Sequence, residues 1–275
     1  MRITRIGVDA GSTLTKIMWQ FDDGTYDCDS VSSVAAKRNI VESIMEKSMT
    51  NAACVIGIGS QEGLERLHLM KPAGDDPIVM EIRLQADGAR RLLMASGAAC
   101  PESFYIASIG TGTSYSAFRN GEFILYPYGR PIGGGMISGL SNLVLGNNHP
   151  PSYKSCDDHY DLDLSDLLQE SDISPADPNI IVASFAKLPQ LKALSKRTFV
   201  ASLFRFVAYN VAQDVGMMKL SVPEIKSVVY IGTIVEQSLL LRNFLDEFSR
   251  LHGIEPVLPL HAGYAGALGA LHAFD

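Results

Sequence analysis

The chain has 275 residues, of which 47% are hydrophobic and 19% charged, a composition typical of a globular protein and not of a disordered one. Acidic residues outnumber basic residues by 30 to 23 without a concentrated basic run, which argues against a non-specific nucleic-acid surface. No apolar stretch approaches the roughly 20 residues that span a bilayer, and the first residues are too polar for a signal peptide. The four cysteines are scattered without a CxxC pair. This pattern favours reduced thiols in a soluble intracellular protein over a disulfide framework or a zinc site.

The part of the chain before residue 100 predicts strands and helices around one short turn. The expected elements are a hairpin of strands over 3–9 and 15–21, a helix over 38–49, a buried strand over 53–59 and a half-exposed helix over 80–96. Gly88 is unfavourable inside the last of these helices. The small-residue stretch 97–103 is a plausible boundary, so we expect two domains, 1–100 and 101–275.

After this boundary the opening pattern returns. The segment "FYIASIGTGTSYSAF", 104–118, is again a strand, a turn of small and hydroxyl residues, and a strand. The later expected elements are a hairpin over 120–135, a helix over 136–146, a polar loop over 147–162, a long helix over 197–218 and a strand–helix–strand–helix series over 227–274. The alternation predicts an α/β fold with mixed sheets and two similar lobes.

Asp9 stands in an apolar strand directly before the turn "AGST". Backbone N–H groups in a tight turn of Gly11, Ser12 and Thr13 can hold phosphate oxygens, and a carboxylate at the strand end can hold Mg²⁺. Lys16 is near enough in sequence to add a positive charge. Taken alone, the hairpin favours a structural turn in which Asp9 caps local N–H groups.

A second turn, "IGTGTS", offers glycines for close backbone approach and the hydroxyls of Thr111, Thr113 and Ser114. Two such turns, one in each expected lobe, favour a nucleotide held between the lobes. "YIGTIVEQSLLLRNFL", 230–245, adds a strand that ends at Gly232 before a helix, where the backbone can pass close to an adenosine. Taken alone, that segment favours an ordinary strand-to-helix turn.

Three consecutive glycines, Gly133, Gly134 and Gly135, run into the helix expected over 136–146. Glycine loses conformational entropy on folding, so three together need a reason. Close approach of a ligand to a helix N-terminus is one explanation, and a flexible hinge is the other.

Glu81 opens the helix expected over 80–96. An acid in a first turn is favoured by the helix dipole, and without further information this is the simpler explanation. The functional alternative is a general base that takes a proton from a substrate hydroxyl during phosphoryl transfer.

An acidic run contains Asp157, Asp158, His159, Asp161 and Asp163. These residue types can ligate a metal. In a polar loop, however, they are more typical of a solvated acidic surface, which is the interpretation we expect to hold.

The ordered set of motifs resembles the type II pantothenate kinases. "IGVDAGSTLTKI", "MEIRLQADG", "IGTGTS", "GGGMISGL", "VVYIG" and "GYAGALGAL" occur in the order and spacing of that family, from about residue 5 to residue 273. The resemblance implies the acetate and sugar kinase/Hsc70/actin fold, in which two RNase H-like lobes surround an ATP cleft. It also implies a cytoplasmic homodimer that transfers the γ-phosphoryl group of ATP to pantothenate in the first step of coenzyme A synthesis. An acyl-coenzyme A regulator is a further candidate partner.

The resemblance also implies roles for individual residues. Asp9 and Lys16 would serve Mg²⁺ and the phosphates, and Glu81 matches the catalytic glutamate, seven residues before Gly88. Tyr264 would lie near the substrate, in a final helix that is a candidate for packing back toward the first lobe, and the C-terminal lobe would supply the dimer helix. The implied nucleotide site contains Gly11, Ser12 and Thr13 in the first loop, Gly110, Thr111, Gly112, Thr113 and Ser114 in the second, Gly133, Gly134 and Gly135 beside them, and Gly232 near the adenosine.

The chain departs from the family on the acceptor side. Tyr126 stands where the family usually carries an arginine that contacts pantothenate, and Arg130 is the candidate replacement. Three alternatives therefore stay open: a kinase of another hydroxylated acceptor such as a sugar, a relative that binds a nucleotide or acyl-coenzyme A without turnover, and an ATPase activator of reductase enzymes. The scattered cysteines speak against the activator, because those proteins bridge an iron–sulfur cluster with cysteines.

Overall fold

The structure is a computed structural model, and it describes residues 2–32, 53–56, 76–96, 100–146, 158–168, 180–190 and 192–273. The helix predicted over 38–49 and most of the polar loop predicted over 147–162 lie outside these residues. Within the described part, no helix is long and apolar enough to cross a membrane.

The first sheet is formed by the N-terminal strands. Its order is β3-β2-β1-β4, with β1 at Ile3–Ala10, β2 at Leu14–Phe21, β3 at Tyr26–Ser32 and β4 at Ala53–Ile56. β1 and β2 form the predicted antiparallel hairpin, in which Asp9 lies opposite Lys16, and β4 runs parallel to β1. Val8 and Asp9 in β1 point to opposite faces of the sheet and are 0% and 4% exposed, so the strand is covered on both faces. This burial accounts for its almost continuous apolar sequence.

The second sheet has the order β11-β10-β5-β6-β7. Its strands are β5 at Phe104–Ile109, β6 at Thr113–Arg119, β7 at Glu122–Arg130, β10 at Ser227–Ile231 and β11 at Glu255–Val257. β5 and β6 form the second predicted hairpin, and β10 is parallel to β5 and to β11. The prediction of a separate hairpin over 120–135 is wrong, because β7 pairs back on β6, with Phe123 opposite Phe118. A short turn at Asn120 and Gly121, both with positive φ, makes this return possible.

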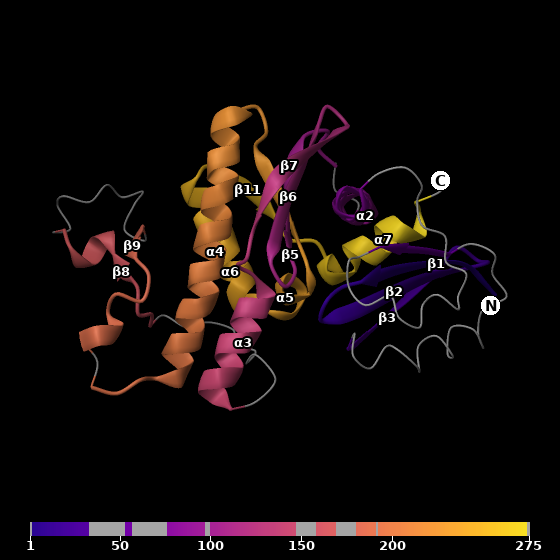
Figure 1. The fold of residues 1–275 in the computed structure, drawn as a ribbon. Helices are drawn as coiled ribbons and strands as arrows, with labels where there is room; N and C mark the ends of the chain where they lie inside the picture. The colour runs from indigo at the N-terminus through magenta and orange to yellow at the C-terminus, as the bar shows by residue number, and fades with distance from the viewer. Residues whose placement is uncertain are drawn as a thin grey trace.

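Helices cover one face of the second sheet. The long α4, Lys196–Ser221, lies beside α6, Leu239–Leu251, as Figure 1 shows, with the short α5 at Thr233–Gln237 and α3 at Gly134–Leu145 next to them. Phe204, Val207 and Val211 of α4 pack with Tyr105 and Tyr230 of the sheet in the main core. A two-stranded sheet of β8, Leu162–Asp163, and β9, Ile181–Ala183, lies on the outer side of α4 (Figure 1), with 3-10 turns at Leu164–Asp166 and Leu188–Gln190.

The acidic run beside β8 is not a solvated surface, and that prediction is wrong for its best-placed members. Asp161 and Asp163 are 0% and 5% exposed, and both bind the buried Arg205 of α4. Arg205 Nη1 donates to each carboxylate at 2.9 Å, and His159 Nε2 lies 3.1 Å from Asp163. The carboxylates are buried because a cation from a distant helix compensates them, a partner that the local sequence did not indicate.

Two helices lie between the sheets, α2 at Pro77–Ala95 and α7 at Ala265–Leu271, which follows the 3-10 turn Ala262–Tyr264. α2 packs on the second sheet through Ala86, Ala89 and Leu93, which contact Phe104 and Phe118. α7 lies between α2 and β1 (Figure 1), and its Ala267 and Leu268 pack against Met18 of β2. The division of the chain at residue 100 stays a prediction. α2 comes before this boundary but packs on the second sheet, and α7 comes after it but packs on the first sheet.

The crossing of α2 and α7 depends on glycine. A Cβ atom on Gly88 would collide with the Ala265 carbonyl oxygen, and one on Gly269 would collide with the carbonyl oxygen of Leu84. The backbones therefore touch directly, which fixes α2 against the rest of the molecule. Gly88, unfavourable for an isolated helix, is required by this contact.

Candidate active site

A cleft of about 670 Å³ opens between the two sheets. Three segments that follow β1, β5 and β10 line it, together with the first turns of α2 and α3. The predicted site residues that line it are Asp9, Gly11, Ser12, Thr13, Lys16, Glu81, Gly110, Thr111, Gly112, Thr113, Ser114, Arg130, Gly134, Gly135 and Gly232. Gly133 and Tyr264 are not among the lining residues. Residues far apart in the sequence are thus gathered around one cavity.

The first hairpin presents a buried carboxylate at the end of β1. Asp9 is 4% exposed, and Lys16 Nζ on the neighbouring strand lies 3.3 Å from Asp9 Oδ2. Gly11 N donates to the Leu14 carbonyl oxygen at 3.1 Å and closes the turn. A Cβ on Gly266 of α7 would collide with the Asp9 carboxylate, so α7 fixes that side chain from behind. One carboxylate and one ammonium group are consequently held at the floor of the cleft.

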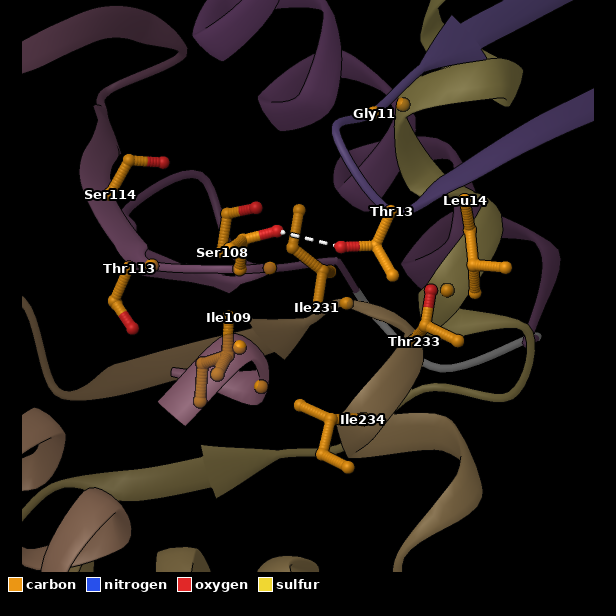
Figure 2. Close-up of a pocket in the computed structure, with 18 of the residues that line it drawn as sticks. Gly11, Thr13, Leu14, Ser108, Ile109, Thr113, Ser114, Ile231, Thr233 and Ile234 are labelled. Atoms are coloured by element: carbon orange, nitrogen blue, oxygen red, sulfur yellow. Dashed lines mark hydrogen bonds between the residues drawn. The ribbon is translucent and has the colours of Figure 1, made fainter. Parts of the chain in front are cut away.

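The second hairpin approaches the first across the cleft. Ser12 Oγ lies 2.7 Å from Thr111 Oγ1, and Thr13 Oγ1 lies 3.3 Å from the same oxygen. Figure 2 shows Thr13 pointing over the cleft toward the second hairpin, with Ser114 further along that side. Three hydroxyl groups therefore converge between the lobes, and hydroxyls with tight-turn amides are suitable partners for phosphate oxygens.

The three glycines at the start of α3 are explained by contacts with the second hairpin. Gly134 N and Gly135 N donate to the carbonyl oxygens of Gly110 and Thr111 at 2.7 and 3.0 Å. A Cβ on Gly133 would lie within 2.9 Å of the Gly110 and Gly112 carbonyl oxygens. The start of α3 is thus packed onto the backbone of the second hairpin and holds it in shape. Those two amides are already used by the protein.

The third segment passes closely under the second hairpin. Gly232 has a φ of 123°, and a Cβ there would collide with the Ile109 carbonyl oxygen. Its N–H donates to the Ala262 carbonyl oxygen at 2.9 Å. Figure 2 shows Ile231, Thr233 and Ile234 on this side of the cavity, opposite Thr13 and Leu14. The apolar side chains here suit the flat ring of a ligand, while the hydroxyls face the hairpins.

Glu81 enters the cleft from α2, but it does not open that helix as predicted, because α2 begins at Pro77 and has no acid in its first turn. Asp76 caps this helix by accepting from Ile78 N at 2.8 Å, and Pro77 occupies the first helical position. Glu81 and Gly88 are seven residues apart, almost two helical turns, so both face the same way. Gly88 brings the helix against α7, and the same face carries Glu81 into the cavity. The spacing of the two residues therefore has a geometric cause.

Arg130 lines the cleft but already has a strong partner. Its Nε and Nη2 donate to the two oxygens of Asp214 at 2.8 and 2.7 Å, and Tyr115 also donates to Asp214. The hydrogen bonds from Arg130 to Asp214 raise the pKa of the arginine further. Tyr126, on the same strand, has a hydroxyl oxygen that is buried without a hydrogen-bond partner among the described residues. The guanidinium is about half exposed, so its remaining nitrogen is the one available to a ligand.

Tyr264 lies apart from the cavity wall. It is half-buried against Met18 and Leu268, in the small core beneath the first sheet, and burial raises the pKa of its hydroxyl. The sequence analysis missed Gln85, which lines the cleft one turn after Glu81 and donates to it at 3.1 Å. The four-residue spacing on one helix was the signal that could have identified this pair.

The two sheets, the cleft between them and a hydroxyl-bearing hairpin on each side define the fold of the actin- and hexokinase-type proteins. Solved structures agree. The activator of a 2-hydroxyisocaproyl-CoA dehydratase from Clostridium difficile, with bound ADPNP, superposes with a TM-score of 0.59 at 16% identity and covers 98% of this chain and 92% of its own. A ROK family glucokinase from Streptomyces griseus, in complex with glucose and AMPPNP, gives a TM-score of 0.55 at 12% identity, covering 98% of each chain. At these identities the likeness establishes the fold alone.

The chain belongs to the Fumble family, whose model matches residues 100–273, well over half of the sequence. It is 25% identical over 276 aligned residues to a type II pantothenate kinase of Staphylococcus saprophyticus, which covers 98% of this chain and 99% of that protein. A type II pantothenate kinase of Bacillus cereus is 24% identical and covers 97% of both chains. The resemblance predicted from the six motifs is thereby confirmed.

Proposed function

We propose that this protein is an ATP-dependent kinase that phosphorylates the primary hydroxyl of pantothenate, the first step of coenzyme A synthesis. The observation that carries the proposal is the placement of Glu81 in one cleft with both hairpins. The named relatives are type II pantothenate kinases along almost their whole length. Two solved structures of this fold contain ADPNP and AMPPNP, which supports a nucleotide in the cleft here.

The residues of the cleft divide the task between them. The hydroxyls of Ser12, Thr13 and Thr111 and the turn amides around them bind the phosphate oxygens, while the segment at Gly232 accommodates the adenosine. Lys16 provides positive charge at the floor of the cavity. Phosphoryl transfer is catalysed chiefly by positioning and charge compensation, so these contacts account for much of the expected acceleration.

Glu81 would act as the general base. The carboxylate accepts the proton of the acceptor hydroxyl as the hydroxyl oxygen attacks the γ-phosphorus, and ADP leaves with the electron pair of the broken bond. The rigid crossing of α2 with α7 keeps the carboxylate in place during this step.

The donor set suits Mg²⁺ bound together with a nucleotide. Among the described residues there is no cluster of three metal-ligating side chains, but Asp9 offers one buried carboxylate beside the hairpins. Mg²⁺ in kinase sites is held by one or two carboxylates with phosphate oxygens and water. Asp9 would hold the ion, which when bound neutralises charge on the phosphates.

Arg130 remains the candidate for the pantothenate carboxylate. Two of its nitrogens are used by Asp214, so it would bind through Nη1 while Asp214 and Tyr115 orient it. From the family resemblance we also infer a cytoplasmic homodimer with a dimer helix in the second lobe, and an acyl-coenzyme A regulator. Light scattering of the purified protein tests the dimer.

The test is a coupled assay of ADP release with pantothenate and a panel of sugars. We expect turnover with pantothenate, and a fall in kcat of about 10²–10⁴-fold in Glu81→Gln. Glu102→Gln, an exposed acid outside the cleft, is the matched control and should retain activity. A loss below about tenfold in Glu81→Gln would refute the assigned base. Turnover of sugars alone would refute the acceptor, and a nucleotide-dependent rise in Tm without any turnover would indicate a non-catalytic relative.

A further inference from the structure

Gln85 is a polar cleft residue to which the function above assigns no task. It lies one turn after Glu81 on α2, and its Nε2 donates to Glu81 Oε1 at 3.1 Å. An ionised carboxylate can only accept hydrogen bonds, so the nitrogen of the amide must face it. The carbonyl oxygen of Gln85 is then necessarily turned away from Glu81.

That carbonyl oxygen is unsatisfied. Gln85 Oε1 is buried and has no hydrogen-bond partner within the part of the chain that the structure describes. Buried acceptors are nearly always paired, so an unpaired one beside a reactive group calls for an explanation. The helix cannot shift to relieve it, because Leu84 and Gly88 on either side are buried and a Cβ on Gly269 would collide with the Leu84 carbonyl. Only the side chain can move.

We propose that Gln85 is the positioning residue of Glu81 and that its amide turns over when Glu81 takes up the substrate proton. The inference rests on the proposed role of Glu81. Before transfer, the amide N–H holds the carboxylate. After transfer, Glu81 carries an O–H, and rotation about the terminal torsion of Gln85 presents Oε1 to accept it. That torsion is broad in glutamine, so the rotation is easy.

The chemical balance of the step is unchanged by Gln85. The acceptor oxygen forms a bond to the γ-phosphorus, the bond from that phosphorus to the bridging oxygen breaks with its electrons going to ADP, and the proton goes to Glu81. Gln85 exchanges no proton. Its contribution is that it bonds both forms of Glu81, whereas a lysine or arginine has donors alone and would favour the carboxylate over the acid.

The first test uses Gln85→Met, which keeps the length of the side chain and removes its amide. We expect kcat to fall about tenfold, the size of effect one hydrogen bond to a charged group produces, while KM for ATP and for pantothenate stays within about twofold. Gln213→Met, an exposed helical glutamine on α4, is the matched control. In Glu81→Gln, adding Gln85→Met should cause no further loss, because residues that act as a unit are not additive. Gln85→Leu replaces Gln85→Met if the latter fails to fold in a thermal melt.

The pH dependence of kcat tests whether the Gln85 amide rotates. If the amide only donated to the carboxylate, its loss would disfavour the charged form, raise the pKa of Glu81 and move the acid limb to higher pH. If the amide bonds both forms of Glu81, its loss in Gln85→Met lowers the maximal kcat while the acid limb of the pH profile stays at the same pH. Asp9 and Lys16 of the first hairpin and Arg130 of β7, the other charged groups lining the cleft, are present in both proteins and contribute equally.

Each outcome has one meaning. An unchanged kcat in Gln85→Met overturns the positioning role, and an additive loss in the double variant overturns its action through Glu81. A shift of the acid limb of the pH profile to higher pH in Gln85→Met overturns the proposed rotation of the amide. A wild type that phosphorylates neither pantothenate nor a sugar refutes the proposed function instead, and with it the basis of the inference.

Discussion

Two sets of buried charges in this protein differ in how completely their hydrogen-bonding capacity is used. Arg205 donates to Asp161 and to both oxygens of Asp163, and the three residues are at most 5% exposed. Asp9 is equally buried, yet the hydrogen bond to its side chain within the described residues is the 3.3 Å contact from Lys16. Buried carboxylates need several donors or a cation. Both oxygens of Asp161 and of Asp163 therefore accept hydrogen bonds from protein groups, whereas among the described residues only Oδ2 of Asp9 does so.

The comparison suggests that saturation separates structural from functional charges in this fold. The cluster at Arg205 attaches β8 and β9 to α4, and its ligands are all protein groups. The cleft is lined by Asp9, Lys16 and Glu81, and it also contains a buried Gln85 oxygen that has no partner among the described residues. Perturbed or unsatisfied groups gathered in a cavity are typical of sites that bind ligands.

Removing the cation from the saturated cluster should give the largest effect on stability. Arg205→Met leaves two carboxylates buried and uncompensated, so we expect a loss of about 3–5 kcal/mol in the free energy of unfolding, measured in urea. Arg250→Met is the matched control. Arg250 also binds two acids, Asp246 and Glu255, but it is about half exposed, and its loss should cost below about 1 kcal/mol. Equal losses in the two variants would contradict the distinction.

The unsaturated carboxylate should behave in the opposite way. Asp9→Asn keeps the shape of the side chain and removes its charge, so we expect kcat to fall by about 100-fold or more because charge compensation at the phosphates is lost. The free energy of unfolding should change by less than about 1 kcal/mol, since functional sites are often not optimised for stability. A variant that loses activity only because it unfolds would show that Asp9 is structural.

The contact between α2 and α7 provides an intermediate test. In Gly88→Ala the added methyl group meets the Ala265 carbonyl, so the helices must separate, at an expected cost of about 1–3 kcal/mol and with a displaced Glu81. Gly139→Ala, in α3, meets nothing within 4 Å and should raise stability by about 0.5–1 kcal/mol. Urea titration of both variants checks the sign. If Gly139→Ala also lowered the free energy of unfolding, the open space around Gly139 in α3 would be contradicted.

The smallest effect concerns pH. Burial alone would raise the pKa of Asp163, but hydrogen bonds from His159 and Arg205 outweigh it and hold the pKa below its ordinary value. The ionised group therefore stabilises the fold above the unfolded pKa of about 3.9, and this contribution is lost as the pH falls through the folded pKa. We expect the urea midpoint to decline below about pH 4, with a shallower decline in Asp163→Asn. Identical slopes would exclude Asp163 as the source.

Local patterns predicted the two hairpins, α2, α3 and α4, because strand periodicity and glycine turns are recorded within a few neighbouring residues. The residues that line the cleft came from the family resemblance, since the local patterns alone favoured structural roles for Asp9 and Glu81. Long-range partners were not predictable in this way. Asp161 and Asp163 were predicted to be solvated because their partner, Arg205, lies about forty residues further along the chain. The glycines at the start of α3 were assigned to a ligand or a hinge because the backbone that they contact, that of the second hairpin, is distant in sequence. Gln85 belongs to no recognisable sequence motif. It is identified in the structure by its hydrogen bond to Glu81 and by its buried Oε1, which has no partner among the described residues.

The position of α7 constrains the order in which the molecule can assemble. β1 is synthesised long before α7, the helix at residues 265–271 that covers it and fixes Asp9. During translation, the face of the first sheet that α7 covers stays exposed until residues 265–271 have left the ribosome. Contacts of such sequence separation slow folding. We expect the first lobe to acquire its native protection from hydrogen exchange late, and the floor of the cleft at Asp9 to form last.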